Sequence, residues 1–183
     1  MSKQKSGVEK TLTSKMIYDG RVIKLHLDTI ELPDGNESLR EVIKHPGAVA
    51  IVPVTAKGNI LMVTQYRYAV GKMLLEVPAG TLNPHEAPET CAIREMQEET
   101  GFKPGKIEKI GGIFTAPGYT SEFIHFYLAT DLIPSRLKAD DDEFVDVEEL
   151  PLKTVLEKIA SGEIADGKTV SAILLVKDRL SKV

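Results

Sequence analysis

The segment AGTLNPHEAPETCAIREMQEETGF at residues 79–102 decides the fold. Pro88 suits a first helical position and Gly101 suits the position just past a helix end, so the spacing predicts a helix of about three turns between them. Ile93 and Met96 share the side of this helix that can pack against a core. We therefore expect an amphipathic helix with its apolar side buried.

The opposite side of this helix carries acids. At about 100° per residue, Glu95, Glu98 and Glu99 fall within an arc of roughly 100°, and we expect them to stay accessible. Like charges at this spacing repel, and acids near a helix C-terminus oppose the macrodipole. A divalent cation with oxygen ligands would remove this conflict, and Arg94 can pair with a carboxylate. The spacing alone therefore indicates a metal-binding face, with a solvated acidic face as the alternative.

The full spacing resembles the signature of the Nudix hydrolases. It follows G-x5-E-x7-R-E-U-x-E-E-x-G-U without departure, where U is aliphatic or aromatic. That family hydrolyses nucleoside diphosphates linked to another moiety, with magnesium or manganese. The resemblance implies the Nudix α/β/α sandwich with a mixed sheet, an α/β fold. The matching residues are Gly80, Glu86, Arg94, Glu95, Met96, Glu98, Glu99, Gly101 and Phe102.

Composition limits the class of protein, its binding partners and its compartment. The chain has 183 residues, 42% of them apolar and 27% charged, which suits one globular domain with a small extension. The net charge of -4 argues against a general nucleic-acid-binding surface. The single cysteine, Cys91, fits a reducing compartment and is interpreted as a packing residue rather than a nucleophile. With no secretory signal and no long apolar run, we expect a cytoplasmic protein without membrane contact.

The N-terminal region predicts a small antiparallel β-sheet before the main domain. Residues 1–10 suggest a mobile tail, and alternating apolar and polar residues between 16 and 44 suggest three strands. Such a sheet is too small to be stable alone and must pack on the main domain or on another subunit. We predict domain boundaries at residues 1–45 and 46–183.

The main domain mixes strands and helices. Residues 48–54 form a near-continuous apolar run typical of a buried strand, and a turn at 56–59 suggests a hairpin with the next strand. Strands flanked by helices predict an α/β/α layered domain. Further strands are expected at residues 60–68, 74–77, 107–113, 123–130 and 144–147, and helices from 150 and over 168–180.

Outside the signature, the chain resembles the ADP-ribose pyrophosphatase branch. Pro117 stands sixteen positions after Gly101, where proline points to ADP-ribose in this family. The segments at 20–54, 76–80 and 118–122 also resemble that branch. The resemblance implies ADP-ribose or a related nucleoside diphosphate sugar as substrate. It also implies a homodimer in which the N-terminal sheets are exchanged.

The same resemblance assigns a metal site. It makes Glu95 and Glu99 the principal ligands, with Glu98 assisting and the Ala79 carbonyl as a backbone ligand, for Mg²⁺ with Mn²⁺ as the alternative. Arg94 would help to order the site. The catalytic base would come from the acidic run at 140–143, with Glu143 as first choice. Asp141 is a further catalytic candidate, although relatives often carry Glu there, and a solvated loop is the alternative.

Substrate contacts are expected from several places in the chain. Arg67 can hold a phosphate through two parallel hydrogen bonds, and an ordinary surface arginine is the alternative. Arg40 and Glu41 could reach the partner's adenosine if the sheets are exchanged. Glu122 is a candidate to hold a ribose hydroxyl or a water. The loop with Gly118 and Tyr119 completes this set, Tyr119 as a candidate to stack on adenine.

Two alternatives to ADP-ribose hydrolysis are considered. The same mechanism could act on another nucleoside diphosphate sugar. A non-catalytic nucleotide-binding module is the alternative from a different functional class. It is disfavoured because this chain keeps every acid of the signature, whereas degenerate modules usually lose at least one.

Overall fold

A computed structural model describes residues 7–138 and 144–181 of the chain. The chain divides into two compact units. The N-terminal unit consists of Met1–Pro46 and Phe114–Glu122, and the larger unit of Gly47–Ile113 and Phe123–Val183. In the sequence, the segment at 114–122 lies between the two parts of the larger unit. In space, it packs with the N-terminal strands.

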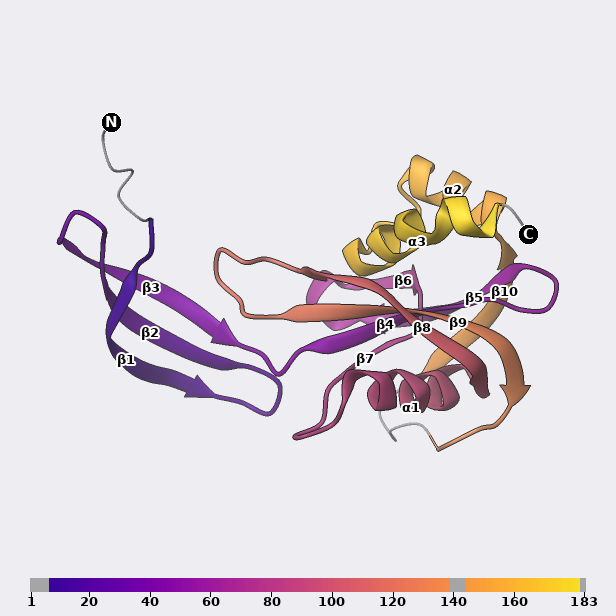
Figure 1. Cartoon of the computed structure of the whole chain (residues 1–183), viewed down its shortest axis with the longest axis horizontal. Coiled ribbons are helices and arrows are strands. Elements are labelled where there is room, and N and C mark those ends of the chain that lie inside the picture. Colours follow the sequence, from indigo (N-terminus) through magenta and orange to yellow (C-terminus); the bar gives the residue numbers. More distant parts are fainter. Residues whose placement is uncertain (1–6, 139–143, 182–183) are drawn as a thin grey trace. The chain divides into compact units, whose positions relative to one another are not determined.

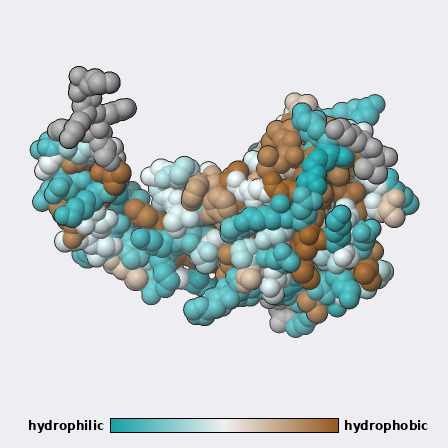
Figure 2. Space-filling model, in the orientation of Figure 1, coloured by the Kyte–Doolittle hydropathy of each residue, from teal (hydrophilic) through white to brown (hydrophobic). Residues whose placement is uncertain are grey.

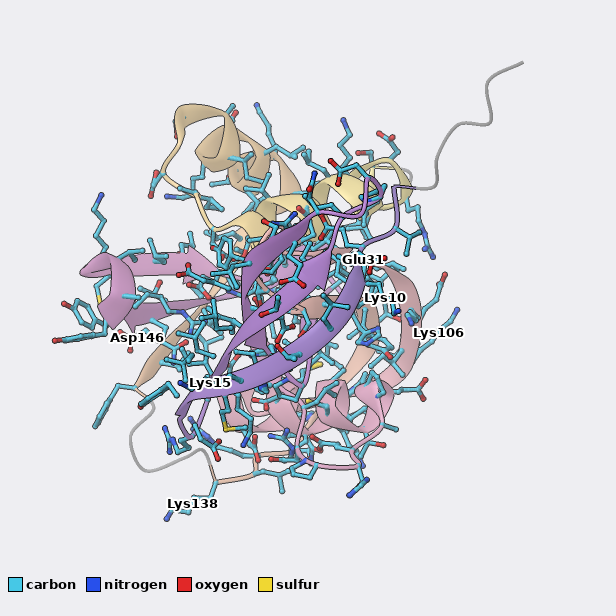
Figure 3. All side chains as sticks on the ribbon, turned by 90° about the vertical axis from the view of Figure 1, so that its left-hand side faces the viewer. Lys10, Lys15, Glu31, Lys106, Lys138 and Asp146 are labelled. Carbon is cyan, nitrogen blue, oxygen red and sulfur yellow. The ribbon has the colours of Figure 1, made fainter. Side chains whose placement is uncertain are left out.

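The N-terminal unit is a three-stranded antiparallel sheet in the order β1-β2-β3. Lys10 pairs with Glu31 at one end of it (Figure 3). The expected tail over residues 1–10 is too long, because β1 already starts at Lys10. The strands are β1 (Lys10–Asp19), β2 (Lys24–Glu31) and β3 (Glu37–Lys44).

This sheet has almost no core of its own within one chain. Every residue of β1 is exposed, including Ile17 and Tyr18 at 50% and 57%. Among the described residues of the unit, Ile30 is the only fully buried hydrophobic side chain. The segment at 114–122 adds to β3, since Ile43 N–H donates to Tyr119 O at 2.8 Å. These contacts leave the four large apolar side chains of β1 exposed, namely Leu12, Met16, Ile17 and Tyr18.

The larger unit contains two sheets (Figure 1). One has the order β10-β5-β6, and the other has the order β7-β4-β9-β8. Strand β4 pairs in parallel with β9 and antiparallel with β7, so the mixed sheet and the expected fold class are confirmed. The strands are β4 (Ala48–Pro53), β5 (Asn59–Arg67), β6 (Lys72–Glu76), β7 (Ala79–Thr81), β8 (Phe102–Phe114), β9 (Phe123–Pro134) and β10 (Val145–Pro151).

Strand β4 lies at the centre of the core because both of its faces are buried. All six of its residues are buried, as the continuous apolar run predicts. Ala50 and Val52 join one hydrophobic cluster with residues of α2 (Leu152–Ser161) and α3 (Gly167–Leu180). Val49 and Ile51 join a second cluster with α1 (Pro88–Thr100). Alternation along one strand thus places helices on both faces.

Figure 1 shows α1 on one side of the sheets and α2 with α3 on the other. The bounds of α1 are those that Pro88 and Gly101 predict, and Gly101 ends the helix in a left-handed conformation with φ 78°. Helix α3 starts at its N-cap Asp166, whose side chain accepts from Thr169 N–H. Hydrophobic side chains reach the surface over α2 and α3 (Figure 2), among them Leu174 and Leu175.

One local expectation is wrong, and two short elements are not predicted by the sequence. The turn after β4 forms, but β4 and β5 belong to different sheets and share only one isolated bridge, Val54 with Ile60. The hairpin is wrong because β4 finds its partners in β7 and β9 instead. The short strand β7 and the 3-10 turn Tyr68–Val70 carry no periodic signal and were not expected. In the described part of the chain, no helix is long and apolar enough to cross a membrane.

Candidate active site

Arg94 on α1 holds three carboxylates together. Its Nε and Nη2 donate to the two oxygens of Glu86, both at 2.9 Å. Its Nη1 donates to Glu95 Oε1 at 2.7 Å and to Glu98 Oε2 at 2.9 Å. The guanidinium is planar and permanently charged, so it fixes the directions of all three acids. One arginine therefore orders both the loop before α1 and the acidic face of α1.

Glu86 ties this loop to the helix. Asn83 N–H donates to Glu86 Oε2 at 3.0 Å, and Glu86 N–H donates to Asn83 O at 3.0 Å. Hydrogen bonds from Arg94 lower the pKa of Glu86 from 4.5 to about 2. The same bonds raise the pKa of Arg94 above its ordinary value. Glu86 is thus held as a carboxylate across the physiological range.

Glu95 and Glu99 lie against β7. Glu99 Oε2 accepts from Ala79 N–H at 3.0 Å. A Cβ atom on Gly80 would overlap the carboxyl group of Glu95, so only glycine leaves space for it there. Both acids are buried, at 7% and 4% exposure, which corrects the expectation that they stay accessible. Periodicity correctly places Met96 in the core, but it cannot show that β7 covers the acidic side.

The donor set suits a hard divalent cation. The carboxylates of Glu95, Glu98 and Glu99 supply the oxygen atoms that magnesium and manganese prefer, and the glycine at position 80 keeps the space beside Glu95 free of a side chain. Within residues 7–138 and 144–181, no three His, Cys, Asp or Glu side chains are gathered as a ready-made metal site. Arg94 instead balances two of these acids by hydrogen bonds. The residues of the candidate site therefore fit a divalent cation chemically.

Arg67 lies at the end of β5 and is held by Glu76 of β6. Its Nε donates to Glu76 Oε1 at 2.9 Å and its Nη2 to Oε2 at 2.5 Å. Lys168 of α3 also donates to Glu76 Oε2. The sequence predicts a substrate contact for Arg67 but no role for Glu76 or Lys168. The signal for Glu76 was available, because it is the one charge in the run Leu74–Val77.

The N-terminal unit contains two of the expected substrate contacts on β3. Arg40 donates through Nη2 to Glu9 Oε1 at 2.5 Å and through Nε to Glu9 Oε2 at 3.1 Å. Glu41 is exposed and pairs in register with Leu27 of β2. Adjacent strand residues point to opposite faces, so Arg40 and Glu41 do not form one cluster within this sheet.

The loop at 114–122 contains three more expected contacts. Tyr119 is 58% exposed, and its N–H donates to Ala116 O at 3.1 Å. Gly118 has open space around it, since a Cβ there would meet nothing within 4 Å. Glu122 Oε2 accepts from Thr115 Oγ1 at 2.8 Å, and its Oε1 lies 3.7 Å from His45 Nε2. Glu122 therefore closes the loop in this conformation.

The expected catalytic bases, Glu143 and Asp141, lie outside the described residues. The chain on either side is anchored in the larger unit. Before it, Leu137 N–H donates to Gln97 O of α1 at 3.4 Å, and Gln97 Nε2 donates to Ser135 Oγ at 2.9 Å. After it, Val145 pairs with Gln65 of β5.

Cys91 is a packing residue, as expected. It is fully buried in the cluster between β4 and α1. Burial, followed by the charge of Glu95, raises the pKa of its thiol to about 12. Such a thiol stays protonated and is a poor nucleophile at neutral pH. Its Sγ accepts a hydrogen bond from Arg94 Nη2 at 3.3 Å, which adds support to that side chain.

Comparison with known families gives two matches. Residues 44–172 match the NUDIX domain. Residues 9–43 match the nucleoside diphosphate sugar hydrolase N-terminal domain. The first match covers the whole of the acidic helix α1, strands β4 to β10, α2 and the start of α3.

Several curated proteins are similar over nearly their whole length. An ADP-ribose pyrophosphatase of Bacillus subtilis is 43% identical, and the match covers 92% of each chain. A methanol dehydrogenase activator of Bacillus methanolicus is 44% identical over 90% of each chain. A GDP-mannose pyrophosphatase of Yersinia enterocolitica is 35% identical over 80% of this chain and 84% of its own.

A solved structure supports the fold. It is described as the crystal structure of an ADP compounds hydrolase, with a TM-score of 0.84, 23% identity and coverage of 95% of both chains. The predicted resemblance is thereby confirmed for the family, and the curated ADP-ribose pyrophosphatase confirms it for the branch. The match of residues 44–172 to the NUDIX domain, together with 43% identity to a curated relative across 92% of both chains, shows that this chain belongs to the Nudix hydrolase family.

Proposed function

We propose that this hydrolase cleaves the diphosphate of ADP-ribose with water, giving AMP and ribose 5-phosphate. One observation carries the proposal: the complete signature is ordered on α1, where Arg94 binds Glu95 and Glu98 and the Ala79 N–H of β7 binds Glu99. Similarity to an ADP-ribose pyrophosphatase across 92% of both chains supports the choice of substrate. Pro117 supports it further.

Divalent metal dependence is general in the family, and we assign Mg²⁺ as the physiological ion, with Mn²⁺ as a substitute. Glu95, Glu98 and Glu99 would hold it, together with the Ala79 carbonyl. A bound divalent cation neutralises charge on the diphosphate and acidifies an attacking water. Arg94 acts on these carboxylates as a positioning residue, because its hydrogen bonds fix Glu95 and Glu98.

Arg67 binds a phosphate of the substrate in this proposal. Its side chain is 38% exposed, although one edge of its guanidinium is occupied by Glu76. A planar guanidinium can hold a phosphate by two hydrogen bonds through its other edge. Arg67 is also close enough to Glu99 for the charge of Glu99 to contribute to its raised pKa, after the larger contribution of the hydrogen bonds to Glu76.

We assign the general base to Glu143, with Asp141 as a second candidate. Hydrolysis requires a group that removes a proton from the attacking water. The described residues before and after this run are bonded to α1 and β5, respectively. Glu143→Gln should lower kcat by about 100-fold. An unchanged kcat in Glu143→Gln and Asp141→Asn would require another base.

The adenosine is assigned to the N-terminal unit of a partner chain. Arg40, Glu41, Gly118, Tyr119 and Glu122 are the proposed contacts. To bind the substrate, Arg40 would have to release its ion pair with Glu9, which is itself exposed. The exposed ring of Tyr119 offers a stacking surface.

The proposed assembly is a homodimer. Strand β1 exposes Leu12, Met16, Ile17 and Tyr18, and a three-stranded sheet needs an apolar face packed against another element. A second copy would bury this strand. Sedimentation should give twice the mass of one chain. A fully active monomer at assay concentration would exclude the exchanged sheet as part of the site.

The deciding experiment is a substrate panel with Mg²⁺, in which release of AMP, GMP and sugar phosphate is measured. ADP-ribose should give the highest kcat/KM. The similarity to a GDP-mannose pyrophosphatase supports the main alternative, another nucleoside diphosphate sugar, which a higher kcat/KM for GDP-mannose would establish. Binding without turnover of any diphosphate would instead favour a non-catalytic module. We place the enzyme in the cytoplasm, where its single cysteine stays reduced.

A further inference from the structure

A buried carboxylate that the metal chemistry does not use lies at the end of β6. Glu76 is 1% exposed and accepts from two cations. Arg67 donates to both of its oxygens, and Lys168 donates to Oε2. Burying the charges of Glu76 and Lys168 carries a large desolvation cost, and buried ion pairs can often be replaced by apolar residues without loss of stability. Stability alone is therefore a weak reason for this arrangement.

The support of Glu76 extends into α3. Lys168 Nζ also donates to Asp166 Oδ2 at 3.0 Å. Asp166 caps α3 by accepting from Thr169 N–H at 3.0 Å and from Thr169 Oγ1 at 2.6 Å. Thr169 Oγ1 in turn accepts from Val77 N–H at 3.0 Å. The start of α3 is thus bonded to both the side chain of residue 76 and the backbone of residue 77.

This network leads directly to the acids of α1. Two residues after Val77, Ala79 N–H donates to Glu99. The charge of Glu99 contributes to the raised pKa of Arg67, after the larger contribution of the hydrogen bonds from Arg67 to Glu76. The guanidinium of Arg67 and the carboxylate of Glu99 are therefore near enough to interact electrostatically.

The guanidinium has one edge committed and one edge available. Of its five N–H groups, Nε–H and one Nη2–H point to Glu76. Among the described residues, no side chain accepts from Nη1. The side chain of Arg67 is 38% exposed, whereas Glu76 and Lys168 are 1% and 12% exposed. The buried partners hold one edge, so the opposite edge faces outward in a fixed orientation.

We propose that Glu76, supported by Lys168, is a positioning residue that orients Arg67 so that its free Nη1/Nη2 edge binds a phosphate of the substrate diphosphate. The proposal rests on the proposed function and extends it to two residues of β6 and α3. Without Glu76 the long arginine side chain would sample many rotamers and bind the phosphate less often in the productive geometry.

A double-mutant cycle tests this role through kcat/KM. Glu76→Gln should lower kcat/KM for ADP-ribose by about 10- to 100-fold, and Arg67→Met at least as much. In the Arg67→Met background, Glu76→Gln should have no further effect, because Glu76 acts through Arg67. An equal loss in both backgrounds, or no loss in either, would overturn the proposal.

The chain supplies a matched control. Glu108 and Arg179 form another ion pair with two hydrogen bonds, from Nη1 and Nη2 of Arg179, at 3.0 and 2.6 Å between β8 and α3, and both residues are about half exposed. Glu108→Gln breaks that pair outside the residues assigned to the site. It should leave kcat/KM unchanged. If Glu108→Gln lowered kcat/KM as much as Glu76→Gln does, the effect of Glu76→Gln would be explained by general destabilisation.

Binding of inorganic pyrophosphate separates this proposal from the proposed function. Calorimetry in the presence of Mg²⁺ needs no turnover, so it applies even if ADP-ribose is not the substrate. Glu76→Gln should weaken pyrophosphate binding by about 10-fold or more. If Glu76→Gln does not fold, Lys168→Gln removes only the supporting cation and should still weaken binding severalfold. Unchanged affinity in the folded variant would contradict the positioning role.

Discussion

Gly80 of β7 and Glu95 of α1 share a space that only a residue without a Cβ atom permits. A Cβ built on Gly80 would overlap the carboxyl carbon and both oxygens of Glu95. The backbone of Gly80 is not in a left-handed conformation, so close approach rather than backbone freedom requires glycine here. This close approach of Glu95 explains why the family signature has glycine at this position.

Gly80→Ala should displace Glu95 and lower kcat/KM by about 100-fold, because displacing a catalytic group by about 1 Å has an effect of this size. Gly167→Ala is the matched control, since a Cβ at Gly167 meets nothing within 4 Å. Steady-state kinetics and thermal unfolding of both variants provide the check. Full activity in Gly80→Ala would show that the position of Glu95 is unimportant.

Glu99→Gln should lower kcat by at least about 100-fold while the fold survives, because an amide of the same shape is a far weaker ligand for a divalent cation. Glu89→Gln in the exposed first turn of α1 serves as its control. Mg²⁺ titrations followed by turnover and by circular dichroism separate loss of function from loss of structure. An unchanged rate would remove Glu99 from the site.

The ion pair of Glu86 with Arg94 should make stability depend on pH in acid. The pKa of Glu86 is depressed from 4.5 to about 2, so its contribution is complete above about pH 4.5 and disappears as pH falls through about 2. Wild type should therefore exceed Glu86→Gln in free energy of unfolding at pH 6, and the difference should shrink steadily toward pH 2. Urea unfolding at four pH values measures it. A constant difference would mean that Glu86 acts by packing alone.

Cys91 should resist alkylation in the native protein. With a thiol pKa of about 12, its thiolate at pH 8 is roughly 1,000-fold scarcer than that of an ordinary cysteine, and burial slows the reagent further. Iodoacetamide labelling followed by mass spectrometry is unambiguous, because the chain has one cysteine. Labelling should become fast in urea. Fast labelling in native buffer would show that α1 opens readily from β4.

The parts of the fold that follow local rules could be predicted from the sequence. Pro88 and Gly101 fix the ends of α1 because each has a backbone preference that acts within one turn. The continuous apolar run at Ala48–Pro53 marks a strand that is buried on both faces. In contrast, the partners of that strand depend on residues far away in the chain. The local turn at 56–59 predicts a hairpin with β5, and this prediction is wrong because β4 pairs with β7 and β9 instead.

The candidate site also divides into features that local spacing predicts and features that depend on distant residues. The acids of α1 and Arg94 lie within one helix, so their spacing predicts that they meet. Their burial by β7 could not be predicted, since it requires the packing of Gly80 on Glu95. The bond between Glu76 and Lys168 spans 92 residues and leaves no periodic trace. A lone acid in an apolar strand can raise suspicion, but only the fold identifies its partner.

The distance along the chain between Glu76 and Lys168 also imposes an order on biosynthesis. A ribosome needs roughly 5 to 20 seconds to make the 92 residues between them, and during this time the nascent strand has a carboxylate without its second cation. Until α3 emerges and supplies Lys168, Glu76 has Arg67 as its cationic partner, and its burial is less well compensated. The complete support of Arg67 therefore forms only after residue 168 has been made.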